Sequence, residues 1–86
     1  MSQEELKRRI KQGVWELIES EPNSLSELMS WSERAVSVKE LMASDVGDIQ
    51  IPHALWHYLD DADIRLKDDR YAVEQIKYIK TIMDQW

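Results

Sequence analysis

Residues 69–85 carry the most regular apolar pattern in the chain, and this pattern constrains the fold most strongly. Apolar side chains recur there at intervals of three and four residues, which places them on one face of an α-helix. One stripe consists of Ala72, Ile76, Ile79, Met83 and Trp86, and a second stripe beside it consists of Tyr71, Tyr78 and Ile82. Together they span about 160° of the helix surface, whereas the apolar face of an ordinary surface helix spans about 100°. Such a helix has to contact neighbours on two sides, either within its own bundle or across a dimer.

A second long helix is predicted over residues 3–20. Apolar residues recur there with the same helical spacing, at Leu6, Ile10, Val14, Leu17 and Ile18. Ser2 and Glu5 match a capping box, in which the hydroxyl and the carboxylate each accept a hydrogen bond from an unpaired backbone N–H. The helix should end before Pro22, because proline disfavours the helical conformation of the residue that precedes it.

Residues 24–43 have a helical composition, but their continuity is ambiguous. Three further Ser-x-x-Glu matches begin at Ser24, Ser30 and Ser37. They cannot all start separate helices within twenty residues, and Ser24 is the best start and Ser37 the next. We therefore predict two short helices with a kink near residues 34–36, and one continuous helix is the alternative.

Shorter elements of structure are predicted for the rest of the chain. Residues 44–48 form a loop in which Gly47 allows a left-handed turn. Pro52 suits the first position of a helix that ends at about residue 59 to 61. Residues 63–69 are predicted as a connection or short turn, with Asp68 as the N-cap of the last helix. Together these elements predict an all-α, single-domain bundle over residues 1–86, with four or five helices and long N- and C-terminal ones.

Composition limits the classes of function. The chain has 86 residues, a formal net charge of −6 and no cysteine. Disulfides and thiolate metal sites are therefore excluded, and a reducing, cytoplasmic setting is favoured. Residues 1–5 lack the apolar segment of a signal peptide, and no apolar run reaches the ~18–20 residues that cross a bilayer. An acidic chain is not expected to bind nucleic acid or anionic membranes. A chain this short gains stability from oligomerisation, so a homodimer is one expectation.

His53, His57 and Asp60 are the residues that come nearest to a metal site. Their i, i+4, i+7 spacing places them within about 60° of one another on a helix, which could hold a divalent ion. Leu55 and Leu59 occupy the opposite face, so the His/Asp face should face solvent. We predict ordinary surface here, and a metal-binding or catalytic role is the alternative. The chain has no serine with an identifiable base and no glycine-rich phosphate loop, so neither an enzyme nor a cofactor is predicted.

Two family resemblances occur in short segments. Val38-x-x-Leu41-x-Ala43, followed by Gly47 and a helix over residues 52–59, resembles a helix-turn-helix. The resemblance implies a three-helix architecture whose second helix enters the major groove. That helix would present no Lys or Arg and is followed by acidic residues that repel phosphate, so DNA binding is only an alternative function.

The second resemblance is to acyl carrier proteins, another family of small acidic helical domains. It is carried by Asn23-Ser24-Leu25 and by the segment from Asp48 to Pro52. Family members attach phosphopantetheine to the serine of an Asp-Ser-Leu motif, so the resemblance would assign that role to Ser24. Two features depart from the family pattern: Asn23 replaces the aspartate, and the first helix runs almost directly into the motif.

Tryptophan and tyrosine are the only aromatic residues, with four Trp, three Tyr and no Phe. Both types are favoured at half-exposed surfaces and interfaces. Most of them are expected in the core, but Trp15 and Trp31 fit their stripes poorly and are predicted at an interface, together with Trp86.

Charge is unevenly distributed along the chain. Residues 44–69 contain seven Asp against Arg65 and Lys67, a local net charge of −5. Asp60, Asp61 and Asp63 lie in this region and are predicted interface residues. The basic cluster at residues 7–11 is predicted to be a solvated helix face, with a binding patch as the alternative. We therefore predict a protein-binding or regulatory module whose acidic, aromatic-flanked surface binds a basic protein or a second copy.

Overall fold

Five α-helices make up the regular structure of the residues that the computed structural model describes, namely 2–45, 47 and 49–86. They are α1 (Gln3–Glu19), α2 (Leu25–Ala43), α3 (His53–Asp60), α4 (Ala62–Lys67) and α5 (Asp69–Gln85). The predicted all-α bundle is confirmed, and α1 and α5 are the long terminal helices that the apolar spacing predicted. In the same part of the chain, no helix is both long and apolar enough to cross a membrane.

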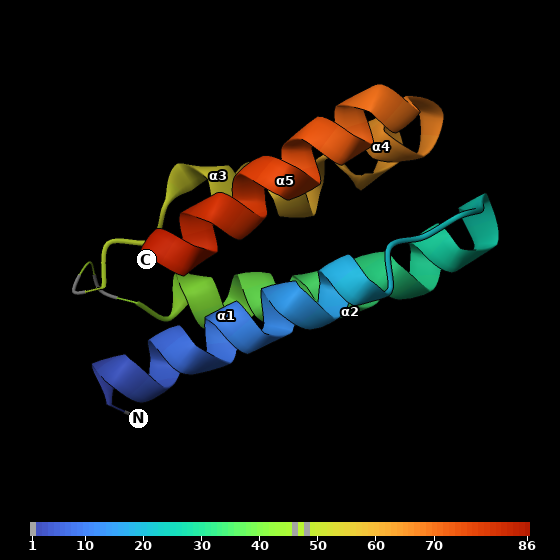
Figure 1. Cartoon of the computed structure of the whole chain (residues 1–86). Helices are drawn as coiled ribbons and strands as arrows, with labels where there is room; N and C mark the ends of the chain where they lie inside the picture. The colour runs from blue at the N-terminus through green and yellow to red at the C-terminus, as the bar shows by residue number, and fades with distance from the viewer. Residues whose placement is uncertain (1, 46, 48) are drawn as a thin grey trace.

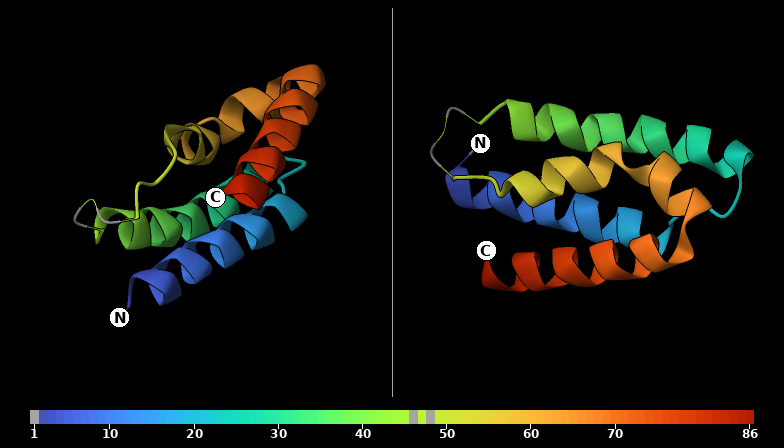
Figure 2. Two further views of the ribbon diagram at one scale, coloured as in Figure 1. Left: turned by 60° about the vertical axis from the view of Figure 1, so that its left-hand side comes forward. Right: turned by 90° about the horizontal axis from the view of Figure 1, so that it is seen from above.

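The helices form two layers (Figure 1). α1 and α2 run antiparallel to each other in one layer, and α3, α4 and α5 form the other. The views in Figure 2 show that α1 begins and α5 ends at the same end of the molecule, whereas the α1–α2 connection and α4 lie at the opposite end. The two ends of the bundle are therefore built from different parts of the chain.

α1 has the cap and the buried face that the sequence predicted. The Ser2 hydroxyl accepts a hydrogen bond from the Glu5 N–H at 3.1 Å, and Ile10, Val14 and Leu17 are buried. Gly13 lies where α1 packs against α2, and a Cβ built on it would come within 2.8 Å of Val38 Cγ2. The absence of a side chain at this position allows the two helices to pack closely.

α2 is one continuous helix, so the prediction of two short helices with a kink at residues 34–36 is wrong. Its buried residues form one stripe through the expected kink: Trp31, Ala35, Val38 and Met42. A break within this stripe would turn one half of it away from the core. Ser24 is the N-cap and accepts a hydrogen bond from the Glu27 N–H at 3.3 Å, while Ser30 and Ser37 are exposed positions inside the helix.

The segment after α2 agrees with the sequence in part. Gly47 has the left-handed conformation expected of it, with φ of 96°; residues 46 and 48 of the same predicted loop lie outside the described residues. Pro52 is the N-cap residue of α3 and so precedes its first turn. The connection predicted at residues 63–69 is instead largely the short helix α4, because Ala62 and Arg65 both point into the core at helical spacing.

Buried apolar residues from all five helices form one core cluster. At its centre the Trp31 and Tyr58 rings meet edge to face, with their centroids 5.8 Å apart. The wide apolar face of α5 is only partly covered: Ile79 and Met83 are buried, whereas Tyr78 is exposed. α5 packs on α3 and α4, and Asp68 caps it by accepting a hydrogen bond from the Tyr71 N–H at 3.1 Å.

Candidate binding surfaces

A groove runs between α2 and the α3–α4 segment, and we call it the α2 groove. It has a volume of about 330 Å³, and the residues that line it are Leu28, Ser32, Ala35, Val36, Lys39, Leu59, Asp60, Ala62 and Asp63. Apolar side chains from α2 face two aspartates across it. The groove therefore combines an apolar wall with an acidic one.

The apolar wall continues onto the outer surface of α2. Leu25 and Met29 are each 72% exposed, and Val36 is 49% exposed. Together with Ser32 they follow one line along the helix, because their spacings of three and four residues place them one turn above another. Large apolar residues that are this exposed and contiguous are typical of a surface that another molecule covers.

Acidic residues lie on both sides of this apolar line. Asp60 and Asp63 line the groove on one side. Glu33 and Glu40 are exposed on the other side, one helical turn beyond Met29 and Val36. Of the described residues that line the groove, Lys39 is the only cation, and its ammonium makes an ion pair with Asp60. The surface around the apolar line is therefore negative overall.

The three predicted interface aspartates have different environments. Asp60 and Asp63 are exposed and line the α2 groove. Asp61 is half-buried, and its Oδ2 accepts hydrogen bonds from the Tyr71 hydroxyl at 2.7 Å and from the Gln75 amide at 3.0 Å. Asp61 Oδ2 thus has internal partners, and an interface role for Asp61 stays a prediction.

A buried cluster around Arg65 was not predicted from the sequence. Arg65 is only 2% exposed. Its Nε donates to Glu21 Oε1 at 2.5 Å, and its Nη1 donates to the Tyr58 carbonyl at 2.5 Å and to Gln75 Oε1 at 2.8 Å. Its guanidinium carbon lies 3.9 Å from the centroid of the Tyr58 ring. Arg65 therefore joins the α1–α2 connection to α3, α4 and α5.

Tyr58 shares Glu21 with Arg65. Its hydroxyl donates to Glu21 Oε2 at 2.9 Å. Burial raises the pKa of the Tyr58 phenol far above its ordinary value, and the negative charge of Glu21 adds to the increase. In the Arg65 cluster, the Glu21 carboxylate thus accepts hydrogen bonds from both a neutral phenol and a guanidinium, so the cluster serves as a structural clamp. One sign of it was present in the sequence: Gln75 lies inside the wide apolar face of α5 and therefore requires a buried polar partner.

The three predicted interface tryptophans also differ. Trp31 is 1% exposed and donates its indole N–H to the Leu17 carbonyl at 3.0 Å. The prediction of Trp31 at an interface is therefore wrong, because it fills the core between α1, α2 and α3. Trp86 is half-buried and donates to the Ile49 carbonyl at 3.1 Å. Trp15 is half-buried as well, and part of its ring lies on the surface.

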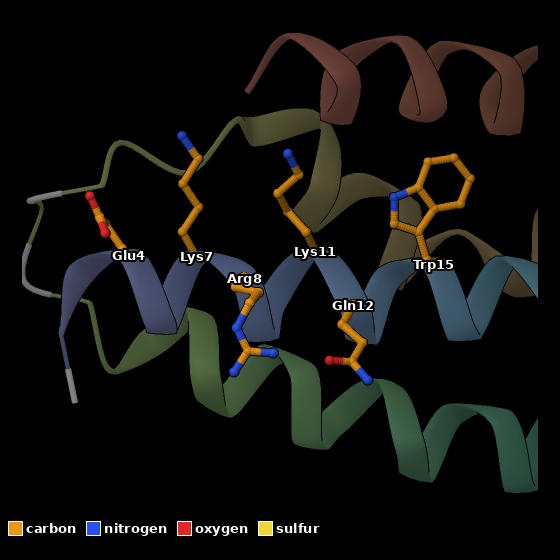
Figure 3. A pocket seen from close by; sticks show the side chains of 6 residues that line it. All are labelled: Glu4, Lys7, Arg8, Lys11, Gln12 and Trp15. Carbon is orange, nitrogen blue, oxygen red and sulfur yellow. The ribbon is translucent and has the colours of Figure 1, made fainter.

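A second surface lies on α1, and we call it the α1 hollow. Its volume is about 570 Å³, and its lining residues are Glu4, Lys7, Arg8, Lys11, Gln12 and Trp15. Figure 3 shows that Lys7, Lys11 and Trp15 rise from the side of α1 that faces α5. Lys7, Arg8 and Lys11 belong to the basic cluster that the sequence predicted to be a solvated face, and Arg9 of the same cluster does not line the hollow.

The histidine and aspartate candidates for a metal site do not converge. His53, His57 and Asp60 are all exposed along the outer side of α3, and Asp60 makes its ion pair with Lys39. Within residues 2–45, 47 and 49–86, no group of three His, Cys, Asp or Glu side chains is arranged to hold a metal ion. The geometry that a metal site requires is thus not formed by these three residues.

The two resemblances find little support in the geometry. A helix-turn-helix joins its helices by a turn of about three to four residues, whereas residues 44–52 separate α2 from α3. Ser24, the candidate for phosphopantetheine attachment, is the N-cap of α2. Comparison of the chain with protein-family models, with characterised proteins and with solved structures gives no match.

Proposed function

We propose that this protein is a protein-binding module whose α2 groove receives a basic amphipathic helix of a partner protein. The observation that carries the proposal is the exposed apolar line of Leu25, Met29 and Val36 beside the groove. Burial of these side chains would supply the apolar contact, since the removal of apolar surface from water is favourable.

The acidic residues beside the line decide what kind of helix fits. Asp63 and Glu33 are exposed and make no ion pair with any described residue. A helix with Lys or Arg on both sides of an apolar stripe would place its cations next to these carboxylates. Charge complementarity of this kind speeds association and selects among partners. Anchors at helical spacing are the usual way in which an amphipathic helix binds a groove.

The test uses a fluorescently labelled helical peptide built from Lys and Leu, titrated with the protein. Replacing the exposed apolar residues in the double variant Leu25→Gln/Met29→Gln should weaken binding by about tenfold or more. The matched control is Ile64→Gln/Val73→Gln, which removes two exposed apolar side chains from α4 and α5. Equal loss in both double variants would contradict the proposal.

Charge is tested separately. Asp63→Lys should weaken binding and reduce its dependence on salt, whereas Asp84→Lys on α5 changes the net charge equally and lies outside the groove. Sedimentation of the protein alone distinguishes the remaining occupant: concentration-dependent dimers that Leu25→Gln/Met29→Gln dissolves would show that a second copy covers the groove.

A further inference from the structure

We infer that the α1 hollow is a second docking surface, which binds an acidic segment of a partner protein through its cations and through the exposed part of Trp15. This inference concerns a different face of the molecule from the α2 groove and does not depend on the function proposed for that groove. The part of the basic cluster at residues 7–11 that lines the hollow would then bind the acidic segment.

The first support is that the cations of the hollow are not neutralised. Lys7, Arg8 and Lys11 make no ion pair within the described part of the chain. In contrast, the neighbouring Arg9 pairs with Glu5 at 3.0 Å. Among the described residues that line the hollow, Glu4 is the one carboxylate, so these three cations and one anion carry a net charge of +2, in a chain whose net charge is −6.

The second support is that one of these cations, Lys7, is held beside an aromatic ring. The Lys7 ammonium lies 5.1 Å from the centroid of the Trp86 ring. Trp86 in turn is held by its hydrogen bond to the Ile49 carbonyl, so Lys7 is positioned by two other segments of the chain. The half-buried Trp15 ring and the aliphatic stems of the lysines provide apolar area, because such side chains bury their stems while their charged ends stay in water.

The shape of the hollow favours a polypeptide segment. Glu4 and Trp15 mark its ends and are separated by eleven residues of helix, or about 16 Å at 1.5 Å per residue. The surface is open along this length, so a short segment could lie on it with its carboxylates near the cations and an apolar side chain against Trp15. A polyanion such as single-stranded nucleic acid also stacks on tryptophan, but it would extend beyond the hollow into the field of an acidic protein, which repels it.

The probe is a labelled peptide of repeated Glu-Glu-Leu triplets, with a Gln-Gln-Leu peptide as its neutral counterpart. Binding is followed by chemical-shift changes of backbone amides and of the four indole N–H groups. We expect the Glu peptide to shift α1 amides and the Trp15 indole, and the Gln peptide to bind at least several-fold more weakly. Shifts spread over all helices, or tighter binding of an oligothymidylate of equal charge, would overturn the inference.

Charge reversal provides the decisive comparison. Arg8→Glu/Lys11→Glu should weaken binding of the Glu peptide by about tenfold, because attraction becomes repulsion at two positions. The control Lys67→Glu/Lys77→Glu changes the net charge by the same amount at two exposed cations outside the hollow. If both double variants weaken binding equally, only the net charge matters and the docking surface is refuted. Circular dichroism of each variant establishes that the helices are retained.

Discussion

Arg65 joins four separate segments of the chain. It contacts Glu21 before α2, the Tyr58 carbonyl in α3 and Gln75 in α5, all from α4. A guanidinium suits this position because its donors lie in a fixed planar fork, whereas a lysine ammonium is a single point of charge. Arg65 Nε and Nη1 make these hydrogen bonds, whereas Nη2 has no partner among the described residues.

Arg65→Met is predicted to lower the free energy of unfolding by about 3 kcal/mol, because it leaves the Glu21 carboxylate and the Gln75 oxygen without their donor. Arg65→Lys should recover only part of this loss. Urea denaturation followed by circular dichroism measures both variants. The double variant Glu21→Gln/Arg65→Met should be more stable than Arg65→Met alone, since the unpaired carboxylate is gone. A loss below about 0.5 kcal/mol in Arg65→Met, the range of ordinary surface substitutions, would contradict the clamp.

We predict that the buried Tyr58 phenol causes a loss of stability at alkaline pH. The folded state raises the pKa of Tyr58 above the unfolded value of about 10, because burial and the neighbouring Glu21 both disfavour the phenolate. The stabilisation that this shift provides is fully present below about pH 10 and decreases as the pH rises above that value. Denaturant unfolding from neutral pH to above pH 10 should therefore show a steep decline that is weaker in Tyr58→Phe.

A comparison of two tyrosine variants separates the effect of Tyr58 on stability from the effects of the other groups that titrate at high pH. Tyr78→Phe removes an exposed phenol and should leave the alkaline decline unchanged. At neutral pH, Tyr58→Phe should cost about 1 kcal/mol, since Glu21 loses a hydrogen bond. A decline of equal steepness in wild type and Tyr58→Phe would show that another group causes it.

At the scale of elements, the packing of α1 on α2 depends on Gly13. Alanine at this position would gain about 1 kcal/mol in helix propensity, but its Cβ would lie 2.8 Å from Val38 Cγ2. Valine is stiff at χ1 and cannot easily turn aside. Gly13→Ala should therefore destabilise the protein, by about 1–2 kcal/mol. In a Val38→Ala background the collision is absent, so the same change should be neutral or stabilising.

A double-mutant cycle from urea denaturation measures this coupling. Additive effects of Gly13→Ala and Val38→Ala would mean that the two helices do not meet as described.

Some of the helices could be predicted from the sequence and others could not. α1 and α5 were predicted to within about a residue because long apolar stripes and local capping residues define them. α2 was predicted to break because Ser37 resembles a helix start, and the stripe from Trp31 to Met42 that keeps the helix continuous is a tertiary requirement. α4 was missed because an arginine at an inward position looks like surface until Glu21 and Gln75 are known to surround it.

The candidate surfaces were less predictable than the helices. Leu25 and Met29 resemble core residues in the sequence, and only the placement of α3 and α4 shows that α2 leaves them uncovered. Asp63 was predicted to be an interface residue from charge density alone, and so was Asp61, two positions earlier, whose carboxylate hydrogen-bonds to Tyr71. Local charge density therefore does not distinguish the two aspartates, because the direction of each side chain depends on packing that sequence spacing does not determine.

At the scale of the whole molecule, the two proposed surfaces have opposite charge and use different helices. The α2 groove is lined by residues of α2, α3 and α4, and the α1 hollow by residues of α1. No residue is shared between them. A small protein with two such faces could hold a basic segment and an acidic segment of other proteins at once, which is the arrangement of an adaptor.

The two surfaces should bind their peptides independently of each other. Leu25→Gln/Met29→Gln should weaken binding of the Lys-Leu peptide by about tenfold. Its affinity for the Glu-Glu-Leu peptide should stay within about twofold of the wild-type value, because substitutions at separate sites without shared partners act additively. Arg8→Glu/Lys11→Glu should show the reverse pattern. Each peptide is titrated alone by fluorescence anisotropy, since the two probes would otherwise bind each other. Both affinities should fall as salt rises from low ionic strength, where screening is weak, to about 0.15 M, where the Debye length is about 8 Å. Equal weakening of both peptides by either variant would mean that the protein has one diffuse binding surface rather than two.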